Sequence, residues 1–414
     1  MQSGDTAWLL LCTALVLFMT PGLAFFYGGM VRAKNVLAML AQNFSVIAIV
    51  SIVWVLFVYS LAFGPDVGDG LIGNLHFVGF AHVNEAIPGL HLTVPPVLYA
   101  TFEMMFAVLT IALLTGAGAD RMTFGGFLTF SVAWITIVYA PVAHWVWSPR
   151  GWLATRHLLD FAGGTVVEIS AGASALALVL VLKPRHGWPR EAMPPHSLPL
   201  TLLGAGILWF GWFGFNAGSA LAAGNLAAQA LLNTHLGACA GLIGWLVVEK
   251  ARTGHATTLG AASGAVAGLV ALTPSCGYVN SMGAILIGFA AGAVGVLAIQ
   301  LKFRWRLDDA LDVIGVHGIC GVIGTLAIGV LATHTVNPLG RGMIDGSAGI
   351  AQLGRQALGI VAVAAWAFVA TYLIARVLHR TMGLRVEPMD EITGLDKAIH
   401  AESAYEHLSS SRHR

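Results

Sequence analysis

Apolar residues follow one another along most of this chain in runs that are much longer than the alternating patterns of a soluble protein. A helix needs about 20 predominantly apolar residues to cross the hydrocarbon core of a bilayer. We therefore expect an all-α polytopic membrane protein whose transmembrane domain covers residues 1–378. Eleven runs of about this length lie near residues 6–30, 36–63, 94–118, 122–147, 161–182, 198–218, 226–248, 256–273, 278–301, 310–333 and 352–378.

The polar segments between these runs carry positive charge unevenly. If the N-terminus lies outside, the inner loops hold eleven Lys and Arg residues and the outer loops hold four, and the other six lie from Arg376 onward. Cytoplasmic loops are enriched in Lys and Arg. This predicts an N-terminus outside and a cytoplasmic C-terminal tail, residues 379–414, which is too short for a catalytic domain.

Composition agrees with a membrane protein and excludes several other classes. Hydrophobic residues make up 57% of the 414 residues and charged residues only 10%, whereas a soluble domain has about 25% charged residues. The four cysteines are scattered, with no CxxC or His/Cys cluster, so neither a metal site nor a disulfide framework is predicted. No HExxH or GxSxG motif occurs, so we expect no enzyme, no cofactor and no nucleic-acid partner.

The segment 160–174, DFAGGTVVEISAGAS, carries two acids inside this apolar sequence. Glu168 lies eight residues after Asp160 and is surrounded by small residues that allow close helix packing. A carboxylate near the centre of a membrane helix costs about 2.5–3.5 kcal/mol and faces a cavity or a partner.

A weak internal repeat suggests that partner. VVEISAGA in the fifth run aligns with GVHGICGV in the tenth, which places Glu168 opposite His317 and Gly172 opposite Gly321. Two sets of five spans related in this way form a 5+5 inverted repeat, as in many transporters. The repeats would cover about 6–182 and 198–333, followed by a long eleventh helix at about 352–378.

Longer motifs occur in a fixed order along nearly the whole chain. With them the sequence resembles the ammonium transporter (Amt/Mep/Rh) family, closest to its bacterial Amt branch. The motifs are PGLAFFYGGMVRAKN, DFAGGTVVEISAG, GWFGFNAGSAL, GAVAGLVALTPSCGYV and LDVIGVHGICGVIGTL, with GLRV and GLDKAIHAESAY in the tail.

The resemblance implies an outer vestibule in which Trp147 and Ser219 recruit the cation. A cation over an aromatic face gains about 0.5–2 kcal/mol, and a serine hydroxyl accepts an N–H bond. Phe106 and Phe215 would gate the pore, with Phe106 also at the binding site. Phe102 would support them and Trp212 would line the lower pore, although ordinary core packing accounts equally well for Trp212.

The pore centre departs from the family pattern. Two histidines are usual there, and this chain has Glu168 at the first position and His317 at the second. Some fungal members also carry glutamate. We expect the pair to accept the proton of ammonium and relay it, so that ammonia and the proton cross separately. The alternative is a buried acid–imidazole contact that only joins two helices.

Three further acids are candidates for supporting roles. Asp160 is expected to cap a helix start and to favour a nearby cation through its field. Asp312, at the inner end of the tenth run, is expected to act in the same structural way. Glu103 stands where the family more often has Gln, and the sequence leaves open whether it recruits cations or is kept neutral by burial.

The resemblance also implies partners and a location. It implies ammonium or ammonia as the substrate, with methylammonium as an analogue, a homotrimer in the lipid of the cell inner (plasma) membrane, and a PII-type regulatory protein at the cytoplasmic face. Gly394, Leu395 and Asp396 would anchor the tail to that face. Two alternatives to transport stay open, namely an ammonium sensor that binds without conducting and a neutral channel for ammonia or carbon dioxide.

Overall fold

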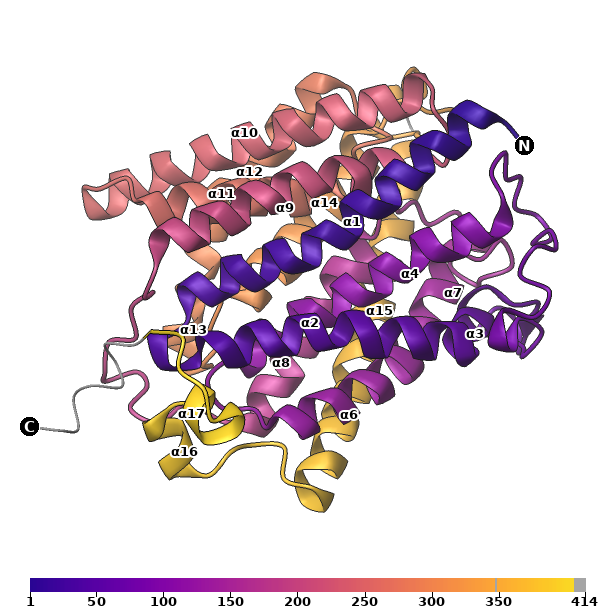
Figure 1. The fold of residues 1–414 in the computed structure, drawn as a ribbon. Helices are drawn as coiled ribbons and strands as arrows, with labels where there is room; N and C mark the ends of the chain where they lie inside the picture. The colour runs from indigo at the N-terminus through magenta and orange to yellow at the C-terminus, as the bar shows by residue number, and fades with distance from the viewer. Residues whose placement is uncertain (347, 406–414) are drawn as a thin grey trace, which may run out of the picture.

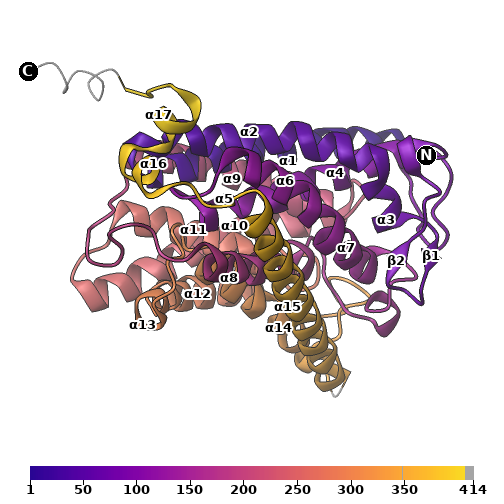
Figure 2. The same ribbon diagram turned by 90° about the horizontal axis from the view of Figure 1, so that it is seen from below.

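Helices that run roughly side by side form a single bundle in the computed structural model, which describes residues 1–346 and 348–405 (Figure 1). The N-terminus and the tail helices α16 (Pro388–Thr393) and α17 (Leu395–His400) lie at opposite ends of the bundle in both perpendicular views (Figures 1 and 2). We call these two ends the N-terminal end and the tail end of the molecule. The predicted all-α membrane architecture is confirmed.

The first five crossings contain three helices with an internal change of winding, where a π-helical segment interrupts or begins an α-helix. They are α1 (Ser3–Met30); α2 (Val36–Val53) with η2 (Trp54–Val58) and α3 (Tyr59–Phe63); α4 (Pro96–Leu113) with α5 (Thr115–Gly118); α6 (Phe124–Trp134) with η4 (Ile135–Tyr139) and α7 (Ala140–Trp147); and η6 (Gly164–Ile169) with α8 (Ser170–Leu182).

The next five crossings and the final helix include one π-helical segment, which begins the tenth crossing. They are α9 (Leu198–Gly218), α10 (Asn225–Thr253), α11 (Thr258–Leu272), α12 (Ser281–Ala298) with α13 (Leu301–Trp305), η7 (Ile314–Ile319) with α14 (Cys320–Leu331), and α15 (Ala348–Thr381).

Short elements occupy the loops and the tail. They are the 3-10 turns η1 (Ala33–Asn35), η3 (Val78–Phe80), η5 (Ala154–Arg156) and η8 (Met343–Asp345), the antiparallel strands β1 (Asp66–Val67) and β2 (Ile72–Gly73), and the tail helices α16 (Pro388–Thr393) and α17 (Leu395–His400).

The eighth predicted span is shorter than expected. Ten of the eleven crossings are helical segments of at least 18 residues, whereas α11 has 15. At 1.5 Å per residue, α11 is about 22 Å long, less than the hydrocarbon core. Its environment makes this tolerable, because α11 packs against α9, α10 and α12 and most of its residues are buried.

Glycines let α1 and α9 approach closely. Along α1 and α9, a Cβ atom added at Gly204 would lie 2.1 Å from the backbone nitrogen of Phe26. One added at Gly211 would lie 2.2 Å from Cγ of Met19. The first helices of the two predicted repeats, α1 and α9, are therefore in direct contact.

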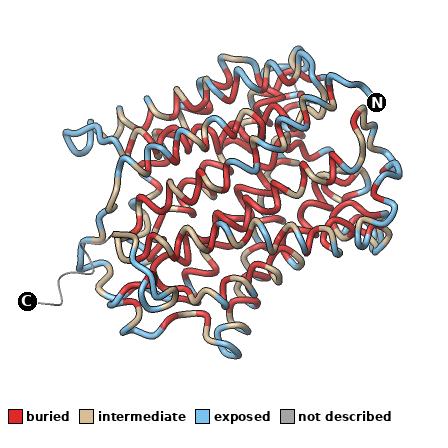
Figure 3. The backbone as a smooth tube through the Cα atoms, viewed as in Figure 1, coloured by how far each residue is buried: buried red, intermediate tan, exposed pale blue. Residues whose placement is uncertain are grey.

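The exposed surface around the bundle is apolar and suits lipid. Buried residues fill the interior of the bundle in Figure 3, and exposed residues lie on the outer helix faces and in the loops. Large apolar side chains on the outer faces include Phe18, Phe44, Ile52, Phe210 and Phe289. In water this surface would favour association, whereas in a bilayer it faces hydrocarbon.

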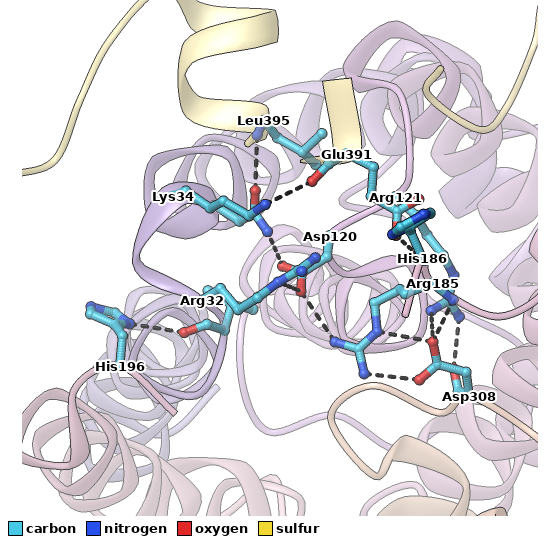
Figure 4. A network of polar contacts seen from close by, with 12 residues as sticks. Arg32, Lys34, Asp120, Arg121, Arg185, His186, His196, Asp308, Glu391 and Leu395 are labelled. Carbon is cyan, nitrogen blue, oxygen red and sulfur yellow. Dashed lines mark hydrogen bonds and ion pairs between the residues drawn. The ribbon is translucent and has the colours of Figure 1, made fainter. Parts of the chain in front are cut away.

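A network of buried ion pairs closes the tail end of the bundle (Figure 4). Asp308 accepts from Arg121 at 2.9 Å and from Arg185 at 2.8 and 2.9 Å. Asp120 accepts from Arg185 at 3.1 Å and from Arg32 at 3.0 Å. The network therefore joins four loops and helix ends that are far apart in the sequence.

The C-terminal tail folds back onto the start of α2, beside this network. The backbone nitrogen of Leu395 donates to Asn35 Oδ1 at 2.8 Å, and Asp396 Oδ1 accepts from the backbone nitrogen of Ala38 at 2.8 Å. Gly394 has a φ of 107° and lies directly on Lys34. The residues expected to anchor the tail thus contact this face. Residues 406–414 of the predicted tail lie outside the described residues.

The pKa of Asp308 follows from this setting. Burial by itself would raise the pKa of its carboxyl, but the hydrogen bonds and charges of Arg185 and Arg121 outweigh burial and hold it below the ordinary value. A group with a lowered folded-state pKa contributes stability that is present above its unfolded pKa of about 3.9 and is lost as the pH falls through the folded-state pKa.

We expect Asp308→Asn to lower the free energy of unfolding by about 3 kcal/mol at neutral pH, because Arg121 and Arg185 lose a buried counter-charge. Thermal unfolding in detergent measures this effect. The exposed Asp69→Asn is the control and should change little. As the pH falls from the unfolded pKa of about 3.9 through the lower folded-state pKa, the difference between wild type and Asp308→Asn should shrink. A pH-independent difference would contradict the assignment.

Candidate functional site

A cavity of about 110 Å³ opens at the N-terminal end of the bundle. One face of α4 supplies Tyr99, Glu103 and Phe106, which are spaced by four and three residues and so share a side of the helix. The other lining residues come from distant parts of the chain and are Leu90, Trp147, Phe161, Ser219 and Leu221. The structure therefore brings the predicted vestibule residues Trp147, Ser219 and Phe106 together.

Hydrogen bonds orient the side chains of Trp147 and Ser219. Trp147, at the end of α7, donates its indole N–H to the carbonyl of Asp160 at 3.2 Å. The hydroxyl of Ser219 donates to the carbonyl of Phe215 at 2.8 Å. Because its proton is used in this bond, the Ser219 oxygen keeps lone pairs that can accept an N–H group.

Aromatic rings close the inner side of this cavity. Phe106 and Phe215 are stacked with their ring centroids 4.2 Å apart, and Trp147 meets Phe106 edge-on at 5.8 Å. Phe102 contacts Phe106 at 4.9 Å, and Trp212 contacts Phe215 at 5.8 Å. Phe106 and Phe215 are each no more than 1% exposed, so bulk solvent does not reach either ring.

Trp212 continues this series of rings toward the tail end. It lies seven residues before Ser219 on α9, which is about 10 Å along the helix. Its indole N–H donates to Thr273 Oγ1 at 2.9 Å, and the residue is 3% exposed. Both packing and a lower-pore position are compatible with this geometry.

Asp160 does not line the cavity; it holds the start of η6. Its carboxylate accepts from the backbone nitrogens of Gly163, Gly164 and Thr165 at 2.6–2.8 Å, and also from the Thr165 hydroxyl. Gly163, with a φ of 115°, makes the turn that these bonds require. The contacts are those of a helix cap.

Glu168 and His317 meet in the interior of the bundle. Glu168 Oε2 and His317 Nδ1 are 2.7 Å apart, and the side chains are 1% and 3% exposed. Each lies on a π-helical segment, η6 and η7 respectively, and such segments are frequent at functional sites. The predicted pair is therefore in direct contact.

Two glycines allow the fifth and tenth crossings to meet here. A Cβ atom at Gly172 would lie 2.3 Å from the Cα of Gly318, and one at Gly321 would lie 2.8 Å from Glu168 Cβ. Gly172 and Gly321 are the residues that the sequence repeat aligns. Each thus lies against the opposite crossing beside its central polar residue, as a two-fold relation between the halves requires.

The repeat also identifies the counterpart of Asp160, and it is not Asp312. Asp309 precedes His317 by eight residues, as Asp160 precedes Glu168, and its Oδ2 accepts from the backbone nitrogen of Ile314 at 2.7 Å. Asp312 instead pairs with Lys302 at 2.6 Å. The structural role expected for Asp312 stays a prediction; its observed contact is this ion pair, and the cap at the eight-residue spacing is made by Asp309.

A family model described as the Ammonium Transporter Family matches residues 7–405. The chain belongs to the ammonium transporter family. It is 47% identical to the ammonium transporter of Mycobacterium tuberculosis (strain H37Rv), covering 99% of this chain and 92% of that protein. It is also 47% identical to the ammonium transporter of Bacillus subtilis, covering 98% of this chain and 99% of that protein.

Solved structures agree with this assignment. Mep2 of Saccharomyces cerevisiae has a TM-score of 0.87 and 34% identity, over 94% of this chain and 88% of Mep2. A structure described as a sensor Amt protein has a TM-score of 0.87 and 29% identity, over 96% and 98% of the two chains. As a member of the ammonium transporter family, the chain is a multi-pass membrane protein.

In this ammonium transporter family member, Glu103 is the least satisfied group of the vestibule. The residue is 8% exposed, and among the described residues its Oε2 atom has no hydrogen-bond partner.

Two buried tyrosines also carry unpartnered hydroxyls within the described chain. They are Tyr59 and Tyr139, whose rings both contact the ring of Trp54. Sequence reasoning missed these tyrosines because single aromatics in apolar helices carry no pattern.

We expect Gly172→Ala to destabilise the protein by about 1–3 kcal/mol, because the added methyl group would overlap the Gly318 backbone and push the two crossings apart. Thermal unfolding in detergent measures this loss. Gly206→Ala on α9 is the matched control, since a Cβ atom there meets nothing within 4 Å. Equal effects of the two changes would show that the crossing is not tightly packed.

Proposed function

We propose that this protein transports ammonium by recruiting the cation in the vestibule, removing its proton, and conducting ammonia and the proton past the Glu168–His317 pair. The proposal rests on three environments that we place one after another between the N-terminal end and the interior of the bundle. A small cavity with an aromatic wall and a hydroxyl acceptor is followed by a stacked phenylalanine pair and then by a buried acid–imidazole contact.

Recruitment rests on the cavity between Trp147, Ser219 and Glu103. The Trp147 ring offers a cation–π surface, and the Ser219 oxygen accepts an N–H bond. The unpartnered Glu103 oxygen supplies a second acceptor. Leaving one oxygen of a buried ionised carboxylate without a hydrogen-bond partner is costly, so a small cation that donates a hydrogen bond to this oxygen relieves that cost on binding. We therefore assign Glu103 to recruitment.

Deprotonation follows from what lies beyond the Phe106–Phe215 pair. A bare cation is expensive in an apolar interior, whereas neutral ammonia is not. The Glu168–His317 contact at 2.7 Å provides two groups that exchange one proton directly. Net transport would then be electrogenic, with the proton passed along the pair while ammonia follows the apolar lumen.

Sensing without conduction is the second candidate function. It is favoured by the similarity to the sensor Amt structure, which matches this chain nearly end to end. Both functions use the vestibule, but only transport needs the Glu168–His317 pair to exchange protons. Whether ammonium current depends on an intact Glu168–His317 pair therefore distinguishes transport from sensing.

The surroundings of the transporter are proposed on the same footing. We place the N-terminal end outside and the tail end in the cytoplasm, as the distribution of Lys and Arg favours. We also propose that the protein forms a homotrimer and that a PII-type regulatory protein docks on its tail end. The described tail, 379–405, would be a cytoplasmic segment separate from the transmembrane domain, 1–378.

We expect Glu168→Gln to reduce ammonium-driven current by about tenfold or more, because glutamine keeps the shape and a hydrogen bond to His317 but cannot exchange a proton. His317→Ala should have an effect at least as large. Currents are measured on proteoliposomes given pulses of ammonium, methylammonium or potassium at several pH values.

Glu387→Gln is the control for these currents, since it removes the same charge from an exposed residue before α16. Undiminished ammonium current in Glu168→Gln would refute the relay. A potassium current equal to the ammonium current would refute deprotonation. Ammonium binding by the wild type without any current or uptake would favour the sensor.

We expect Glu103→Gln to raise the ammonium concentration at half-maximal current about 5–30-fold, which corresponds to about 1–2 kcal/mol of lost cation stabilisation. The maximal current should change little. Glutamine is the more usual family residue here, so the variant is expected to fold. An unchanged half-maximal concentration would show that Glu103 is neutral and does not recruit the cation.

A further inference from the structure

Three potential metal ligands meet in the loop between α3 and α4, at the N-terminal end. Glu85 Oε2 lies 2.8 Å from His76 Nε2, and Glu85 Oε1 lies 2.8 Å from His82 Nδ1. The two imidazole rings are stacked with their centroids 4.7 Å apart. One ligand atom from each of the three residues lies within 4.8 Å of the others.

The backbone holds these side chains in place. The backbone nitrogen of His76 donates to Asn74 Oδ1 at 2.9 Å, and that of the next residue, Phe77, donates to Ser60 Oγ at 2.8 Å. Phe77 is 2% exposed and packs on Tyr59 at 5.4 Å.

The second histidine is also fixed by its backbone. His82 adopts a left-handed φ of 59°, and its carbonyl accepts from the backbone nitrogen of Glu85 at 2.9 Å. A non-glycine residue in this conformation is uncommon and is often found at functional sites. The turn brings His82 and Glu85 onto the same side of the loop as His76.

We propose that His76, His82 and Glu85 form a binding site for one divalent transition-metal ion of the zinc class. Two imidazoles and one carboxylate are the protein ligands of many zinc sites that keep a fourth position for water. The side chains are 35–55% exposed, so the ion can enter directly from solvent.

The electrostatics of the loop support a cation. Residues 64–93 contain Asp66, Asp69 and Glu85 but neither Lys nor Arg. A cation therefore meets a negative field here that is not offset within the loop. The same loop supplies Leu90 to the wall of the vestibule, so a bound ion would lie on the segment that borders the ammonium entry cavity.

Zinc binding by the full chain in detergent tests the proposal. Titration of ZnCl₂ followed by calorimetry should show a site in the micromolar range, and Co²⁺ should give a visible ligand-field spectrum. His76→Ala, His82→Ala and Glu85→Gln should each weaken binding on the order of tenfold or more. Thermal unfolding of each metal-free variant shows whether it is folded, and Zn²⁺ should raise the unfolding temperature of the wild type more than that of these three variants.

Two control variants separate this site from other metal-binding side chains. His334 contacts Asp345 at 2.8 Å and so offers a histidine–carboxylate pair without a second imidazole. Cys239 lies 3.7 Å from His235 on α10. His334→Ala and Cys239→Ser should both bind Zn²⁺ like the wild type. Binding that survives in folded His76→Ala and His82→Ala, or wild-type binding only at millimolar Zn²⁺, would show that the cluster is a set of ion pairs and not a metal site.

Discussion

The contact between Glu168 and His317 is the constraint around which the bundle is arranged. A carboxylate and an imidazole at 2.7 Å, both almost fully buried, can persist in an apolar interior only if each satisfies the other. That requires the fifth and tenth crossings to touch at this depth, which glycines at 172, 318 and 321 permit. Capping by Asp160 and Asp309 then sets the start of each π-helical segment, so both central residues are presented at matching heights.

The polar groups of the molecule are distributed in three layers that differ in how they are satisfied. At the tail end, Asp120 and Asp308 are paired with arginines, and the pairs join loops that would otherwise be held only by short connections. In the centre there is one acid–imidazole contact. At the N-terminal end, Glu103 keeps an unpartnered oxygen beside a cavity. In a structural ion pair both charged groups are already partnered, whereas the vestibule keeps an oxygen that can still accept a hydrogen bond. For this reason we assign ligand recognition to the N-terminal end.

The two halves share their scaffold but not their chemistry. The acid cap, the π-helical start and the packed glycine recur at the same spacing in both, while the central residue is glutamate in one and histidine in the other. A pair of unlike groups divides a proton differently from two imidazoles, because their intrinsic proton affinities differ. The shared scaffold therefore sets where the two central side chains meet, and the unlike side chains make the contact an acid–imidazole pair.

Sequence alone determined the helical membrane architecture and the family, and it predicted the residues that line the cavity and meet in the interior. These depend on the lengths of apolar runs and on motifs, both of which are local in the chain. It overestimated the length of the eighth crossing, because composition does not reveal that neighbouring helices shield α11. Only the tertiary structure decided that Asp309 accepts from the backbone of Ile314 while Asp312 pairs with Lys302. It also decided that Arg121 meets Asp308 across 187 positions and that Glu103 Oε2 is left unpaired among the described residues. Such contacts depend on how helices are rotated and packed against one another, and that rotation is a property of the whole bundle.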